Sequence, residues 1–127
     1  MSALQRERIA VLNDRARQAM GLACVAVATV GFRSLPARDQ SRVRELIETF
    51  DAFDWDNDPH GERDFGVVYR ITDGCWTTAR AQARDDEREH VFWKIDYFDR
   101  ELCFASEDPA DPSVTRRVLT IMLASEY

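Results

Sequence analysis

The chain has 127 residues, of which 45% are hydrophobic and 31% are charged, and its formal net charge is −6. This length fits one domain with a single core, and this composition is typical of a globular protein rather than a disordered one. The longest apolar run, residues 22–30, is too short to cross a membrane, and no signal peptide precedes it. We therefore expect a single soluble, cytoplasmic domain over residues 1–127.

The first elements are expected to be a helix and a strand. Residues 3–20 carry an apolar residue every three or four positions, which predicts an amphipathic helix that ends at Gly21. Residues 24–30 are rich in valine and predict a buried strand that ends at Gly31. This N-terminal part, residues 1–34, precedes the rest of the domain.

A second helix is expected to begin near Pro36, a residue suited to the first helical turn, and to end around Asp54. One of its faces is apolar and is expected to enter the core. It carries Val43, Leu46, Ile47 and Phe50.

Three strands are predicted next, over residues 65–71, 91–97 and 102–105, because these runs are rich in aromatic and β-branched residues. Residues 77–89, which alternate arginines and acids, are expected to form either an exposed helix or a long hairpin. The face of the middle strand that we expect to be buried carries Val91, Trp93, Ile95 and Tyr97.

The last element is predicted to be a helix, with Asp111 as its N-cap and Pro112 at its first position. Its buried stripe is expected to carry Val114, Val118, Ile121 and Met122. The predicted fold class is therefore α+β, with a small antiparallel sheet of three to four strands packed against three helices in the order α-β-α-β-β-β-α.

The acidic loop, residues 54–64, is the most unusual stretch of the sequence. An acidic residue or a histidine stands at every second position: Asp54, Asp56, Asp58, His60, Glu62 and Asp64. From Asp56 the pattern partly follows a calcium-binding EF-hand loop, but Val67 stands where a bidentate glutamate is required. Two readings remain open. Asn57 and Asp58 can close an Asx turn before Pro59, or the loop can form an acidic surface for a basic partner.

Two further carboxylates, Asp96 and Asp99, follow the strand led by Trp93. Paired carboxylates can act as general acid and base where burial separates their pKa values. With the acidic loop they make up the residues that we expect to bind a partner; the catalytic and metal-binding residues stay unassigned. No cofactor is expected, because the chain has no glycine-rich phosphate loop, nucleophile elbow or zinc-binding helix motif.

Charge and cysteine content narrow the partner class. Residues 1–44 carry 8 Arg against 3 acids, whereas residues 45–75 carry 2 Arg against 9 acids, an asymmetry that favours a protein partner. Direct nucleic-acid binding is not expected, because Glu7 and Asp14 interrupt the arginines of the first helix. The three cysteines, Cys24, Cys75 and Cys103, lack a metal-site spacing and are expected to be reduced core residues.

Three ordered segments carry a family resemblance: residues 57–66, residues 92–99, and residues 108–112 running into 115–124. Together they resemble the bacterial family designated domain of unknown function 3768, over most of residues 35–127. The resemblance implies a small protein, often encoded on mobile elements, with no established catalytic residues. The stretch near residues 75–90 is longer than the tight turn that is usual in the family, so it is expected to be an insertion.

These observations predict a non-enzymatic, acidic protein-interaction module. We expect it to be an accessory protein of a mobile element that binds or inhibits a host nucleic-acid-handling or defence complex, with its carboxylates imitating phosphates. The alternative is a small metal-dependent hydrolase or nuclease that uses the acidic loop with Asp96 as ligands. A third reading is oligomerisation through Trp55, Trp76 or Trp93.

Overall fold

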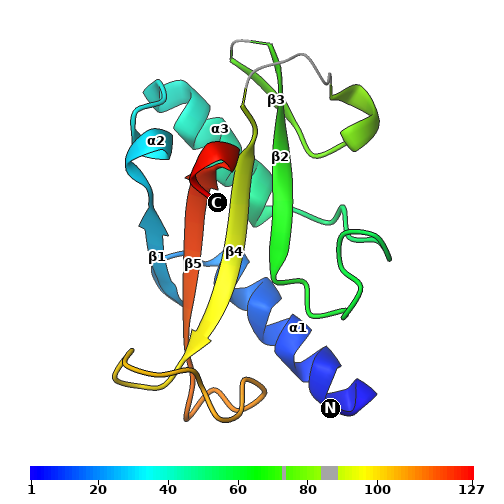
Figure 1. The fold of residues 1–127 in the computed structure, drawn as a ribbon, viewed down its shortest axis with the longest axis vertical. Coiled ribbons are helices and arrows are strands. Elements are labelled where there is room, and N and C mark those ends of the chain that lie inside the picture. The colour runs from blue at the N-terminus through cyan, green and yellow to red at the C-terminus, as the bar shows by residue number, and fades with distance from the viewer. Residues whose placement is uncertain (73, 84–88) are drawn as a thin grey trace.

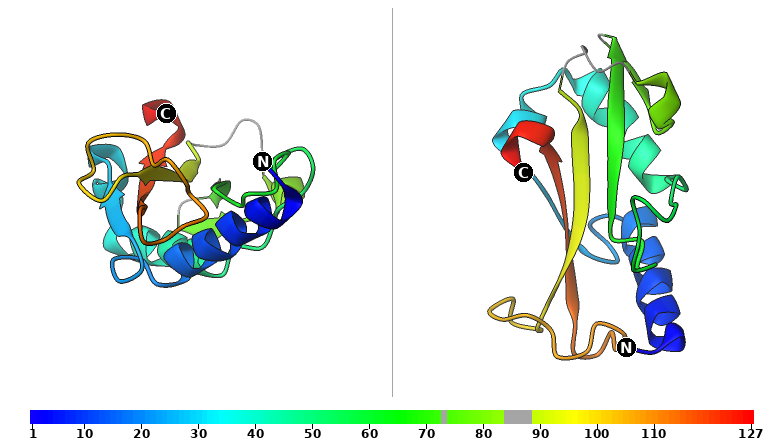
Figure 2. Two further views of the ribbon diagram at one scale, coloured as in Figure 1. Left: turned by 90° about the horizontal axis from the view of Figure 1, so that it is seen from below. Right: turned by 45° about the vertical axis from the view of Figure 1, so that its right-hand side comes forward.

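The computed structural model describes residues 1–72, 74–83 and 89–127. Its sheet has five strands in the order β1-β5-β4-β2-β3, and α1 and α3 cover one face (Figures 1 and 2). None of the helices in these ranges has the length and apolar character that crossing a membrane requires. In chain order the elements are α1 Ala3–Gln18, β1 Val25–Ala28, α2 Val30–Arg33, α3 Ala37–Glu48, β2 Phe65–Thr72, β3 Cys75–Thr77, the 3-10 turn η1 Arg80–Gln82, β4 Val91–Phe98, β5 Arg116–Leu123 and the 3-10 turn η2 Ala124–Glu126. The predicted α+β class is confirmed.

The first helix forms where it was predicted. The Ser2 hydroxyl accepts a hydrogen bond from the Gln5 amide at 3.1 Å, and the Gln5 side chain accepts one from the Ser2 amide at 2.9 Å. This capping box satisfies two backbone donors that the helix itself leaves free. Beyond α1, Gly21 has a φ of 83°, and this left-handed turn directs the chain into β1.

The second predicted helix, α3, begins directly after Pro36 but ends at Glu48, not around Asp54. The Thr49 hydroxyl donates to the carbonyl of Glu45 at 2.9 Å in its last turn. Phe50 then enters the core, where its ring meets Trp93 edge to face at 5.3 Å between centroids. Burial of this aromatic pair competes with continuation of the helix and prevails.

The central strands β2 and β4 confirm two of the predicted strands, and the face of β4 that carries Val91, Trp93 and Ile95 is buried as expected. Gly66 of β2 lies opposite Trp93 in the ladder. A Cβ atom at Gly66 would lie 2.4 Å from Trp93 Nε1 and 2.7 Å from the Phe50 ring. The indole therefore packs directly on the backbone of β2, which only glycine permits.

The last predicted helix was wrong, because residues 116–123 form strand β5. This strand pairs with β4 along eight residues, antiparallel, and with β1 in parallel. Asp111 closes an Asx turn onto Ser113 instead of capping a helix, and Val114 is exposed. The buried residues Arg117, Leu119 and Ile121 alternate with half-buried ones, as in a strand. Val118, Ile121 and Met122 also have helical spacing, so the period of this short run did not separate strand from helix.

The predicted strand over residues 102–105 was also wrong. Leu102 has a φ of 60°, which a strand does not allow, and only Ala105 forms a bridge, to Phe98. The sheet therefore has five strands instead of three to four, and it is mixed instead of antiparallel because β1 runs parallel to β5.

Of residues 77–89, predicted as an exposed helix or a long hairpin, Thr77 ends β3, which forms a short hairpin with β2, and residues 80–82 form the 3-10 turn η1. The remainder of the predicted helix or hairpin, residues 84–88, lies outside the described residues. The cysteines are free, as predicted, but two of them are not in the core: Cys75 and Cys103 are exposed, whereas Cys24 is half-buried. Cys75 begins the edge strand β3, and Cys103 lies in the loop after β4. The local sequence did not reveal that either side chain is exposed.

Candidate interaction surface

The acidic loop connects α3 to β2 and projects on the side of the sheet remote from β1 (Figure 1). The Asp54 carboxylate accepts hydrogen bonds from the backbone amides of Asp56 and Asn57, both at 2.9 Å. The Asn57 side chain accepts from the Asp54 amide at 2.9 Å and donates to the Ala52 carbonyl at 2.7 Å. The Asx turn is therefore at Asp54 and not at Asn57 or Asp58 as predicted, because the Asn57 side chain bonds back to Asp54 and Ala52. Together these bonds fix the backbone that carries Trp55.

The second half of the loop is fastened to α1. The Asp58 carboxylate accepts from the Arg63 amide at 3.2 Å, with Arg63 at a φ of 54°. The Arg63 guanidinium donates to both Asp14 oxygens, at 3.1 and 2.9 Å, and lies 3.6 Å from Glu7. The hydrogen bonds to Asp14 raise the pKa of Arg63 above its ordinary value. A bidentate pair of this kind fixes orientation as well as charge.

A polar network lies beneath this attachment, between α1 and the sheet. Asn13 is fully buried; its Nδ2 donates to the Glu62 carbonyl and to the Tyr97 hydroxyl, both at 2.9 Å. Its Oδ1 accepts from Arg117 Nε at 2.7 Å. The Tyr97 hydroxyl in turn donates to the Glu62 carboxylate at 3.2 Å. The sequence pattern did not reveal this network, because Asn13 and Arg117 stand 104 residues apart.

Burial and neighbouring carboxylates raise the pKa values of two side chains in this region, Asp64 and Tyr97. Burial raises the pKa of Asp64 above its ordinary value, and repulsion from Glu62 and Asp58 raises it further, while His60 lowers it. Burial also raises the pKa of Tyr97, with Asp64 and Glu62 nearby. The structure therefore gathers four of the eight predicted site residues, Asp58, His60, Glu62 and Asp64, within electrostatic range of one another.

The other predicted carboxylates lie elsewhere. Asp96 is on the face of β4 opposite Tyr97, where it pairs with Lys94 at 2.8 Å. Asp99 accepts from the Cys103 amide at 2.9 Å and closes the turn after β4. In the described part of the chain, no three histidine, cysteine or acidic side chains are placed to hold a metal ion. The alternative function, a metal-dependent hydrolase or nuclease, remains a prediction, and the described residues offer no group of side chains that would hold its metal ion.

Trp55, at the tip of the acidic loop, is the most exposed tryptophan. It is 87% exposed, whereas Trp76 and Trp93 are 6% and 0% exposed and belong to the core. A hollow of about 520 Å³ beside it is lined by Arg6, Phe53 and His60, among others. Of the three tryptophans considered for oligomerisation, only Trp55 is available to another molecule.

Comparison with known proteins gives a single match among protein families. Residues 28–126 match a family described as a protein of unknown function (DUF3768). No curated protein and no solved structure matches the chain. The matched range contains the whole acidic loop, β2, β4 and β5, but begins after α1, which supplies Asn13 and Asp14 to the network.

Proposed function

We propose that this chain, which belongs to the DUF3768 family, is a non-enzymatic protein-interaction module whose binding surface is the acidic loop. The observation that carries the proposal is the 87% exposure of Trp55 on a loop whose backbone is fixed by side-chain hydrogen bonds. Tryptophans of this kind dominate the binding energy of protein interfaces, and a pre-ordered loop loses little conformational entropy on binding.

The carboxylates around Trp55 define the partner. Asp54 and Asp56 are exposed on either side of it, and Asp58 is half-exposed. Carboxylates grouped on a rigid surface attract a basic partner over long range and disfavour an acidic one. We therefore propose a partner with an arginine- or lysine-rich groove.

A nucleic-acid-handling or defence complex of a host cell would present such a groove, and the protein would then act as an accessory factor of a mobile element. The support for this finer proposal is chemical, since acidic side chains at a spacing of two residues can occupy a groove that otherwise accepts phosphates.

Affinity capture from a bacterial lysate tests the proposal, with the wild type compared to Trp55→Ala and Asp56→Asn. Neither of these two side chains makes a hydrogen bond or ion pair in the described structure, so both variants should fold normally. The wild type should capture a partner protein that Trp55→Ala fails to capture, because the substitution should raise the Kd for that partner about 30-fold or more. Leu22→Ala, at a 93% exposed residue on the β1 side, is the matched control and should capture it normally.

Raising the salt concentration should weaken capture by the wild type by a larger factor than capture by Asp56→Asn, because salt screens the exposed charge pair that the variant lacks. Intrinsic fluorescence gives an independent reading, since Trp55 is the exposed tryptophan and its emission should shift to shorter wavelength on binding. Equal capture by the wild type and Trp55→Ala would contradict the proposal.

A further inference from the structure

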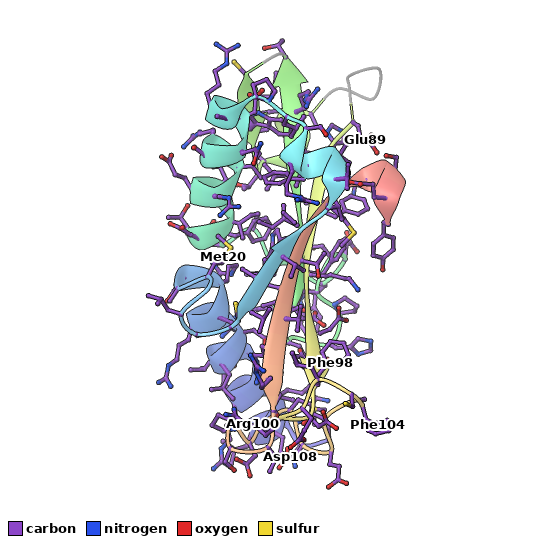
Figure 3. The ribbon with its side chains drawn as sticks, turned by 90° about the vertical axis from the view of Figure 1, so that its left-hand side faces the viewer. Met20, Glu89, Phe98, Arg100, Phe104 and Asp108 are labelled. Atoms are coloured by element: carbon purple, nitrogen blue, oxygen red, sulfur yellow. The ribbon has the colours of Figure 1, made fainter. Side chains whose placement is uncertain are left out.

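A groove of about 620 Å³ lies at the start of β1, on the opposite side of the molecule from the acidic loop. β1 pairs with β5 only from Val118 onward. Among the described residues, no strand therefore lies beside residues 115–117 on that edge of the sheet. Figure 3 shows this edge, with Arg100 below the start of β1 and next to the uncovered part of β5.

The groove concentrates positive charge in a chain whose net charge is −6. Its lining contains Arg15 from α1, Arg100 from the loop after β4, and Arg116 and Arg117 from β5, and none of the lining residues is acidic. Arg15, Arg100 and Arg116 form no ion pair within residues 1–72, 74–83 and 89–127. Cations that line one groove repel one another, and none of Arg15, Arg100 and Arg116 has an ion-pair partner within these ranges that offsets this repulsion. Arg117 has the charge of Glu62 nearby.

One of the four cations is held rigidly. Arg117 is 6% exposed, and its guanidinium donates to Asn13 Oδ1 at 2.7 Å and to the Pro109 carbonyl at 2.6 Å. Burial lowers the pKa of Arg117, because its charge is poorly solvated, whereas Tyr97 and Glu62 act to raise it. A fixed, poorly solvated guanidinium attracts an anion more strongly than a mobile arginine in water does.

Most of the remaining lining is apolar, and part of it is exposed. Leu22 is 93% exposed at the rim, and Leu12 and Pro112 also line the groove. The volume lies in the range of about 300–1,000 Å³ that is usual for small-ligand sites. Charge and apolar surface together therefore suit an amphipathic anion.

We infer that this groove binds a small ligand of nucleotide size that carries two or more phosphate groups. Arg15, Arg100 and Arg116 would pair with the phosphates, and Leu22 and Pro112 would contact the less polar part. A single carboxylate would offset only one of four positive charges, whereas a terminal phosphate group alone carries about −1.5 to −2, and each further phosphate group adds to that charge. The planar guanidinium fork also matches two phosphate oxygens at once.

Calorimetric titration with inorganic triphosphate and with ATP, at physiological ionic strength, tests the inference. Both should bind the wild type, and ATP should bind more tightly because its nucleoside contacts Leu22 and Pro112. The double variant Arg15→Gln/Arg116→Gln removes one exposed and one half-buried cation and should weaken both ligands by about tenfold or more. Arg44→Gln, at an exposed arginine of α3 outside the groove, is the matched control and should stay within about twofold of the wild type.

Three outcomes would overturn the inference. The first is the absence of binding heat with either ligand. The second is a loss of affinity with Arg44→Gln as large as that with the double variant, which would indicate attraction by the overall positive charge. The third is binding of a single-stranded oligonucleotide without binding of triphosphate or ATP. Circular dichroism of each variant, compared with the wild type, ensures that a loss of binding is not a loss of fold.

Discussion

Asn13 joins three parts of the chain through one amide. Its Nδ2 donates to the Glu62 carbonyl and the Tyr97 hydroxyl, and its Oδ1 accepts from Arg117. A buried guanidinium is stable only while its donors are satisfied, so this asparagine supports the charge of Arg117 as well as the position of the acidic loop.

Asn13→Ala should lower the free energy of unfolding by about 3 kcal/mol, because it leaves buried donors and acceptors of Tyr97, Glu62 and Arg117 without partners. Urea denaturation measures this change. Gln18→Ala, at an exposed position of the same helix, is the control and should change stability by less than about 0.5 kcal/mol. If Asn13→Ala also lowered the free energy of unfolding by less than about 0.5 kcal/mol, the result would contradict the stabilising role of the network.

Asp64 should make stability depend on pH. Its pKa in the folded protein is raised above the ordinary value of 3.8, first by burial and then by Glu62. The folded state therefore holds this proton more tightly than the unfolded state, and the contribution of Asp64 to stability falls as pH rises from 3.8 through the raised pKa.

Asp64→Asn removes that titration. The unfolding free energy of the variant, relative to the wild type, should rise as pH increases through this window and then level off. Urea denaturation at a series of pH values gives the difference directly. Asp56→Asn, at an exposed carboxylate of the same loop, is the control. A difference between Asp64→Asn and the wild type that does not change with pH would show that Asp64 is not buried as described.

At the scale of elements, β5 has the most contacts with other strands. It pairs with β4 along its whole length and with β1 along four residues. Its sequence could not distinguish this strand from a helix, because Val118, Ile121 and Met122 also have helical spacing. By contrast β2 and β4 were predictable, since their aromatic and β-branched residues alternate between a buried and a less buried face.

The contact between β2 and the core gives a prediction at this scale. Gly66→Ala should destabilise the protein by about 1–3 kcal/mol, because its Cβ atom would overlap the Trp93 indole and the Phe50 ring. Trp93→Phe in the same chain removes the Nε1 atom that is closest to that Cβ. The two changes together should therefore cost less than the sum of the two single changes, and a thermal or urea double-mutant cycle measures the difference. Simple additivity would contradict the close packing.

At the scale of the whole molecule, opposite charges occupy opposite sides. The acidic loop lies beside β2 (Figure 1), and the arginine-lined groove lies at the start of β1, on the other side of β4 and β5. This separation follows from the fold: residues 45–75 provide the acidic side, whereas the arginines of the groove come from three separate segments of the chain.

The two sites should act independently, because Arg15 and Arg116 share no hydrogen-bond partner with Trp55 or Asp56 in the described structure. Trp55→Ala should leave triphosphate affinity within about twofold of the wild type, and Arg15→Gln/Arg116→Gln should leave capture of the protein partner unchanged. Calorimetry and affinity capture with the same variants provide both measurements. Loss of both activities in either variant would show that the two surfaces form one site.

The sequence by itself determined what depends on local patterns. Helical periodicity placed α1 and the start of α3, alternation placed β2 and β4, and ordered motifs identified the family. Asn57 and Asp58 before Pro59 indicated a turn held by side chains; such a turn is present, but the side chain of Asp54 forms its Asx bonds.

Only the tertiary structure decided what depends on residues distant in the chain. Pairing with β4 and β1 made a strand of residues 116–123, since backbone pairing with two neighbouring strands outweighs a local pattern that also fits a helix. The same pairing brought Arg116 and Arg117 beside Arg15 and Arg100, and it separated Asp96 and Asp99 from the acidic loop. Charge counts along the sequence could not show this, because electrostatic sites form by proximity in space, and the sheet order sets that proximity.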